Sequence, residues 1–109
     1  MATLNEVFIN TRKAMGGKKT TIIDYMKKHK IKGFPGGISD CPLAIAYQKA
    51  FKKAFRSKGV SVIVTGSDIE IAVGDELLSK LTISAEKSFI NAFDTEKLPE
   101  LMVRDNVKS

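Results

Sequence analysis

The chain has 109 residues, of which 43% are hydrophobic, and a single cysteine. This length predicts one domain with one modest core, and one cysteine excludes both an internal disulfide and a multi-cysteine metal cluster. No apolar run approaches the ~20 residues that a membrane-spanning helix needs, and residues 1–6 lack the features of a secretory signal. We therefore expect a protein of the reducing cytoplasm.

The net charge of +6 is unevenly distributed along the chain. Residues 1–59 contain 13 Lys and Arg against 3 Asp and Glu, a balance of +10, whereas residues 60–109 contain 5 against 9, a balance of −4. Such a division predicts a basic surface built by the first half of the chain. A solvated face that only keeps the protein in solution is the alternative interpretation.

Two helices are expected at the start of the basic half. The first is expected over about 4–15, because Thr3 and Glu6 have the spacing of a capping box and an apolar stripe continues until Gly16. The second is expected over about 21–31, after a cap at Thr20 or Thr21, and carries lysines near its end. The following residues, 33–37, are too rich in glycine and proline for regular structure and form the only hinge that the sequence suggests.

The third helix has the clearest signals of the chain. Ser39 and Asp40 are good caps and Pro42 suits a first turn, so we expect a helix from this point until Gly59. One face of this helix is apolar. Another face carries cations at the spacing i, i+3, i+4 and i+7, namely Lys49, Lys52, Lys53 and Arg56.

Two β-branched segments, 60–64 and 69–73, flank Gly66-Ser67 and predict a hairpin with a two-residue type II′ turn. Its register is specified, because a shift of one residue would break the matched apolar pairs on one face. The other face is expected to be wet. The expected apolar pairs are Val60 with Val73, Val62 with Ile71, and Val64 with Ile69.

The rest of the chain predicts a possible third strand within 77–83, a helix over about 85–94 capped by Ser84, a short edge strand at 101–103, and a frayed tail. The predicted fold class is α+β: two N-terminal helices, a central amphipathic helix, an antiparallel β-hairpin or three-stranded sheet, and a C-terminal helix. We expect a single domain over 1–109. Its parts would be a basic helical segment over 1–33, an αββα core over 41–103 and the tail over 104–109.

Residues 41–103 resemble a small family found in bacteria and their phages. The resemblance is carried by Cys-Pro-Leu-Ala at 41–44, a Val-x-Val hairpin, and Phe-Ile-x-x-Phe-Asp at 89–94 before Pro99. This family has no assigned biochemical activity, so the resemblance implies no catalytic residues. It implies an intracellular, phage-encoded protein.

We expect no enzyme active site, no cofactor and no metal. Cys41 lies at a helix start, where the pKa of a thiol can be lowered, but the only histidine, His29, lies among lysines. A small buried residue that anchors the helix is the favoured interpretation of Cys41. One histidine and one cysteine also lack the ligand spacing of a zinc site.

The basic residues predict a non-enzymatic protein that binds an anionic partner, nucleic acid first, since phosphate contacts need positive side chains on one surface. Lysines contact phosphates as point charges, which favours binding that ignores base sequence. The alternative is a phage-encoded protein-interaction module, or an inhibitor of a host system, that uses the hairpin edge. The predicted binding residues are Lys27, Lys28, Lys30, Lys32, Lys49, Lys52, Lys53 and Arg56.

Overall fold

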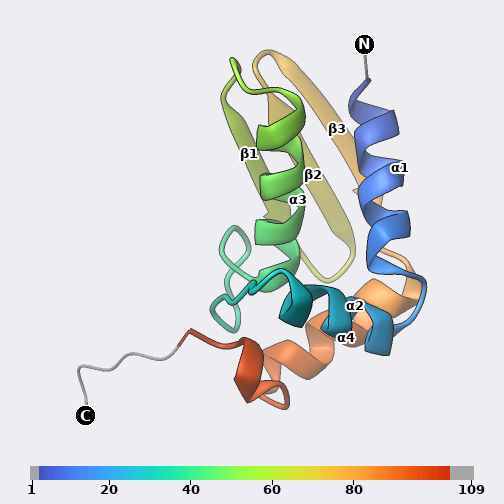
Figure 1. Ribbon diagram of the computed structural model, residues 1–109, viewed down its shortest axis with the longest axis vertical. Coiled ribbons are helices and arrows are strands. Elements are labelled where there is room, and N and C mark those ends of the chain that lie inside the picture. The colour runs from blue at the N-terminus through green and yellow to red at the C-terminus, as the bar shows by residue number, and fades with distance from the viewer. Residues whose placement is uncertain (1–2, 104–109) are drawn as a thin grey trace.

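The structure, a computed structural model, describes residues 3–103. The predicted fold class is confirmed: three helices precede a three-stranded antiparallel sheet, and a fourth helix follows it (Figure 1). The tail predicted over 104–109 lies outside the described residues. The elements are α1 (Leu4–Met15), α2 (Lys19–Lys28), α3 (Pro42–Ala54), β1 (Val60–Val64), β2 (Asp68–Val73), β3 (Glu76–Leu81), α4 (Ser84–Asp94) and a 3₁₀ turn η1 (Pro99–Leu101).

Helix α1 has the predicted bounds, and the predicted capping box is confirmed. The Thr3 hydroxyl accepts the Glu6 N–H at 3.1 Å, and the Glu6 carboxylate accepts the Thr3 N–H at 2.9 Å. Gly16 ends the helix with a φ of 84°, a conformation in which a side chain would be strained.

Helix α2 begins and ends earlier than the predicted range of 21–31. Thr21 lies inside the first turn rather than at the cap, and its hydroxyl donates back to the Lys18 carbonyl at 2.8 Å. The helix stops because Lys30 takes a left-handed φ of 55° and turns the chain away. Lys30 and Lys32 therefore belong to the loop after α2 and not to the helix.

Helix α3 is also displaced from its predicted ends. Its cap is Cys41, whose Sγ accepts the Ala44 N–H at 3.5 Å, and not the preceding serine or aspartate. It ends at Ala54 and not near Gly59, because Phe55 leaves the helical conformation (φ −125°, ψ 63°). The turn that follows reverses the chain into β1, and Arg56 lies in this turn.

The sheet has the strand order β1-β2-β3, and the hairpin register is as predicted. Strand β3, which the sequence left open, pairs with the whole length of β2. One face of the sheet is buried, while the other is largely exposed as predicted. The exposed face includes Leu77 and Leu81, which are 67% and 73% exposed.

The hairpin turn has the predicted length, but the predicted type II′ is wrong. That type needs a positive φ at Gly66, and Gly66 does not have one. The turn is held by side chains instead: the Thr65 hydroxyl accepts the N–H groups of Ser67 and Asp68. The Thr82 hydroxyl donates to the Gly66 carbonyl at 3.1 Å.

Helices α1 and α3 cover one face of the sheet, while α2 and α4 lie together at one end of it (Figure 1). The buried face of the sheet and the apolar sides of the four helices form one continuous core. The largest fully buried side chains are Phe8, Met15, Ile22, Met26, Leu43, Tyr47, Phe51, Ile69, Ile71, Phe89, Phe93 and Leu101.

The glycine-rich loop at 33–37, predicted to be a hinge, is tied down by hydrogen bonds. The Gly33 N–H donates to the Leu101 carbonyl and the Gly33 carbonyl accepts the Val103 N–H, both at 2.9 Å. This isolated bridge replaces the edge strand predicted at 101–103. A side chain at Gly33 would collide with the carbonyl of Asp40, so the close approach requires glycine.

The Glu86 carboxylate is 1% exposed and links three helices. One of its oxygens accepts Arg12 Nη2 at 2.7 Å and the Ile83 N–H at 3.0 Å. The other oxygen accepts Arg12 Nε at 3.0 Å and the Tyr47 hydroxyl at 2.7 Å. Arg12 Nη2 also donates to the Leu81 carbonyl at 2.8 Å. All four lone pairs of this buried carboxylate therefore have a donor.

Aromatic packing holds the same cluster together. The Tyr47 ring stacks on Phe8 at 5.0 Å, and the Arg12 guanidinium lies 4.5 Å from the centre of the Phe8 ring. Burial, and then the charge of Glu86, raise the pKa of Tyr47, so its hydroxyl stays protonated and donates. Burial alone would lower the pKa of Arg12, but the bond to Glu86 and its charge raise it, so Arg12 stays charged.

We predict that Glu86→Ala lowers the free energy of unfolding by about 3–5 kcal/mol, because it leaves a half-buried guanidinium without its counter-charge. Tyr47→Phe should cost about 1–3 kcal/mol, since it removes one donor from a buried carboxylate. Urea denaturation measures both. Glu70→Ala, on the exposed sheet face, is the control and should change stability by at most about 0.5 kcal/mol. An effect of Glu86→Ala no larger than that of the control would contradict this assignment.

Candidate functional site

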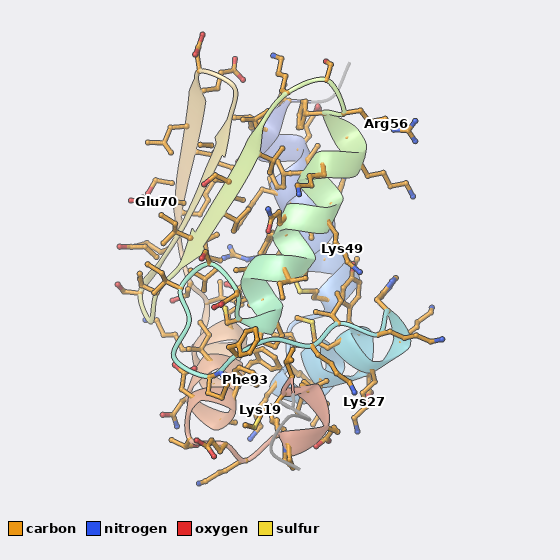
Figure 2. All side chains as sticks on the ribbon, turned by 90° about the vertical axis from the view of Figure 1, so that its left-hand side faces the viewer. Lys19, Lys27, Lys49, Arg56, Glu70 and Phe93 are labelled. Atoms are coloured by element: carbon orange, nitrogen blue, oxygen red, sulfur yellow. The ribbon has the colours of Figure 1, made fainter. Side chains whose placement is uncertain are left out.

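Helix α3 presents its cations to solvent. Its apolar side is buried through Leu43, Tyr47 and Phe51, which turns the opposite side outward. The four predicted cations on this element, three in α3 and Arg56 in the turn after it, are all exposed. Figure 2 shows Lys49 and Arg56 projecting away from the sheet, on the side opposite Glu70.

The second predicted group comes from the end of α2 and the loop after it. Its four lysines are exposed, and the labelled Lys27 projects from the same side of the molecule as Lys49 and Arg56 (Figure 2). Together we call the two groups the cationic surface: Lys27, Lys28, Lys30, Lys32, Lys49, Lys52, Lys53 and Arg56.

Carboxylates neutralise little of the cationic surface. Among residues 3–103, two ion pairs lie within 4.0 Å: the buried Arg12–Glu86 pair and Lys27–Glu100 at 3.2 Å. A hydrogen bond from its own backbone N–H, and then Lys27, lower the pKa of Glu100, so this carboxylate is ionised near neutral pH. The other seven members of the surface have no such partner in the described part of the chain.

A hollow of about 670 Å³ lies at the C-terminal end of α3, against the start of α1 and the beginning of β3. Three cations line it: Lys53 and Arg56 from the cationic surface, and Lys58, which the sequence analysis did not single out. Glu76 is the one carboxylate in its lining. The remaining lining residues are Thr3, Leu4, Ala54, Phe55 and Ser57.

The Cys41 side chain is buried at the N-terminus of α3. It is 6% exposed, and burial raises its pKa, against the small opposing effect of hydrogen bonds from the first backbone N–H groups of α3. It borders a small cavity of about 170 Å³ with Phe89 and Phe93 among the lining residues. The ring of His29 lies against that of Tyr25 in a tilted arrangement, with ring centres 4.1 Å apart.

Residues 3–103 contain no group of three or more His, Cys, Asp or Glu side chains that could hold a metal ion. Nor does any helix in this range have the length and apolar character needed to span a membrane.

No protein-family model, curated protein or solved structure matches this chain. The resemblance of residues 41–103 to a phage and bacterial family stays a prediction.

Sequence reasoning missed the buried cluster of Arg12, Tyr47 and Glu86. One signal was present: Glu86 has the spacing i, i+3 and i+7 with Phe89 and Phe93, so a charge falls on the apolar face of α4. Such a charge must find partners if the helix is to pack.

We predict that native Cys41 reacts with a thiol reagent at least about tenfold more slowly than in the unfolded chain, because burial opposes formation of the thiolate. The measurement is the rate of reaction with a disulfide reagent at pH 8, with and without urea. Equal rates would show that the thiol is accessible and reopen a reactive role for it.

Proposed function

We propose that this protein is a non-enzymatic nucleic-acid-binding protein that contacts the phosphate backbone through its cationic surface. The observation that carries the proposal is that α2, α3 and the residues after each helix expose eight cations, of which Lys27 alone has an ion-pair partner among the described residues. Its labelled members Lys27, Lys49 and Arg56 lie on the same side of the molecule (Figure 2). A single lysine would be an ordinary solvated side chain. Eight exposed cations with one carboxylate partner among them create a positive field that attracts a polyanion.

The spacing of the α3 cations suits a phosphate backbone. An α-helix rises 1.5 Å per residue, so Lys49 and Lys53 are about 6 Å apart along the axis, with Lys52 between them. Phosphates of one strand of a duplex recur about every 3.4 Å of axis, so this stretch of helix spans roughly two of them. Each phosphate that a lysine neutralises releases condensed counterions, which makes the binding favourable and dependent on salt.

The chemistry of the surface favours contact with the backbone rather than reading of base sequence. Seven of its eight members are lysines, which act as point charges, whereas bidentate recognition of bases uses arginine, asparagine or glutamine. We therefore propose binding that does not depend on base sequence and that includes both DNA and RNA. We propose that the protein acts in the cytoplasm, because a single cysteine suits a reducing compartment.

We predict binding of short oligonucleotides whose affinity falls with salt, with a slope of log K against log [salt] of about −3.5 to −6 for duplex DNA, since four to seven phosphates are contacted. The triple variant Lys49→Gln, Lys52→Gln and Lys53→Gln should weaken binding at least about tenfold and make the slope shallower by about 2–3. Fluorescence anisotropy over 50–300 mM salt measures both effects.

The matched control for this experiment is Lys13→Gln, Lys87→Gln and Lys97→Gln, which removes the same charge from exposed lysines outside the cationic surface. It should lose little affinity. Equal losses in the two triple variants would show that net charge, and not this surface, governs binding. Absence of binding at 50 mM salt, or an affinity that ignores salt, would reject the proposal.

A second candidate function, a protein-interaction module or inhibitor of a host system, is favoured by the edge of the sheet at β3. The Thr82 N–H bonds the Ser67 carbonyl, so in this register the main-chain groups of Leu77 and Ser79 point away from β2. An exposed edge with apolar side chains can accept a strand of another protein. A partner captured from nuclease-treated bacterial lysate by the native protein, and lost with Ser79→Pro, would support this function.

A further inference from the structure

The hollow at the end of α3 gathers cations that are close together in the sequence. Because α3 stops at Ala54 and the chain turns at once, Lys53, Arg56 and Lys58 approach the same space from the helix end and the turn. Arg56 and Lys53 also belong to the cationic surface, so the hollow is continuous with it. Lys58 extends that surface into the hollow.

The charge around the hollow stays positive after its own counter-charges are included. Three cations face one carboxylate, Glu76, so a net positive charge remains even though the C-terminal end of α3 contributes about −0.5 of a charge. Among the described residues, neither these three cations nor Glu76 takes part in an ion pair within 4.0 Å. The cations therefore repel one another, and a bound anion would relieve that repulsion.

The volume of the hollow and its apolar lining residues indicate which kind of anion fits it. Its volume of about 670 Å³ lies within the range of roughly 300–1,000 Å³ that is usual for sites of small organic ligands, and a lone phosphate would leave most of it empty. The apolar side chains of Leu4, Ala54 and Phe55 can cover the face of a flat, uncharged ring. The chemistry is that of a nucleotide: a phosphate beside the cations and a base against the apolar side chains.

We infer that this hollow binds a single phosphate-bearing nucleotide, which is the terminal nucleotide of a strand or a free nucleotide. For a strand end, the inference rests on the proposed function, since the cationic surface would hold the strand while the hollow takes its phosphorylated end. Lys58 and Glu76 then have opposite effects: Lys58 strengthens binding of the terminal phosphate, and Glu76 weakens it.

The test uses the whole chain and three single-stranded 12-mers, labelled at an internal base and carrying a phosphate at the 5′ end, at the 3′ end, or at neither. One phosphorylated 12-mer should bind about two- to fivefold more tightly than the unphosphorylated one at 50 mM salt. Lys58→Gln should remove this preference, and Glu76→Gln should increase it by a similar factor. Lys87→Gln is the control and should leave the preference unchanged. Thermal melting verifies that each variant is folded.

Competition with adenosine 5′-monophosphate separates the two sources. If the free nucleotide abolishes the tighter binding of the phosphorylated 12-mer, both ligands occupy the same hollow, which supports the inference. Binding of 12-mers with no preference for a terminal phosphate and no response to Lys58→Gln or Glu76→Gln overturns it, while the proposed function stands. Binding of the free nucleotide that depends on Lys58, without binding of any 12-mer, rejects the proposed function and leaves the hollow as a nucleotide site.

Discussion

The carboxylate of Glu86 is the interaction on which the arrangement of the helices depends. A charge in the protein interior costs several kcal/mol unless its lone pairs are satisfied, and here Arg12 from α1, Tyr47 from α3 and the backbone at the start of α4 supply four donors. An apolar contact tolerates sliding, whereas a bidentate guanidinium pair fixes distance and direction. The cluster therefore specifies how α1, α3 and α4 lie relative to one another. Because Tyr47 is on the buried side of α3, it also determines which side of that helix faces solvent.

That orientation divides the molecule into two sides of different character. The helical side carries Lys49 and Arg56, and the open face of the sheet carries Glu70 on the opposite side (Figure 2). The +10 and −4 balances of the two halves of the chain thus correspond in part to two surfaces. A protein with such a separation of charge turns its positive side toward a polyanion before contact, which raises the rate of productive encounters.

The sequence predicted the features that depend on local signals. The capping box of α1 and the alternating β-branched residues of the hairpin each need only neighbours a few positions away, and both are confirmed. The exposure of the α3 cations followed from the apolar face of the same helix. Distant contacts were not predictable: Arg12 and Glu86 are 74 positions apart, and Lys27 meets Glu100 across the fold. The hollow depends on the turn after Ala54. It was not predicted, because the sequence analysis expected α3 to continue until Gly59.

The bridge between Gly33 and Met102 has a consequence for how the chain acquires its fold during synthesis. The loop before α3 gains its backbone partners from a segment that leaves the ribosome much later. Until then the glycine-rich loop and the apolar side of α3 lack part of their covering, and non-local contacts of this kind slow folding. The loop before α3 should therefore reach its final conformation only after the segment around Met102 has been synthesised. A lysine-rich nascent segment of this kind would meanwhile repel its own copies, which limits aggregation during that interval.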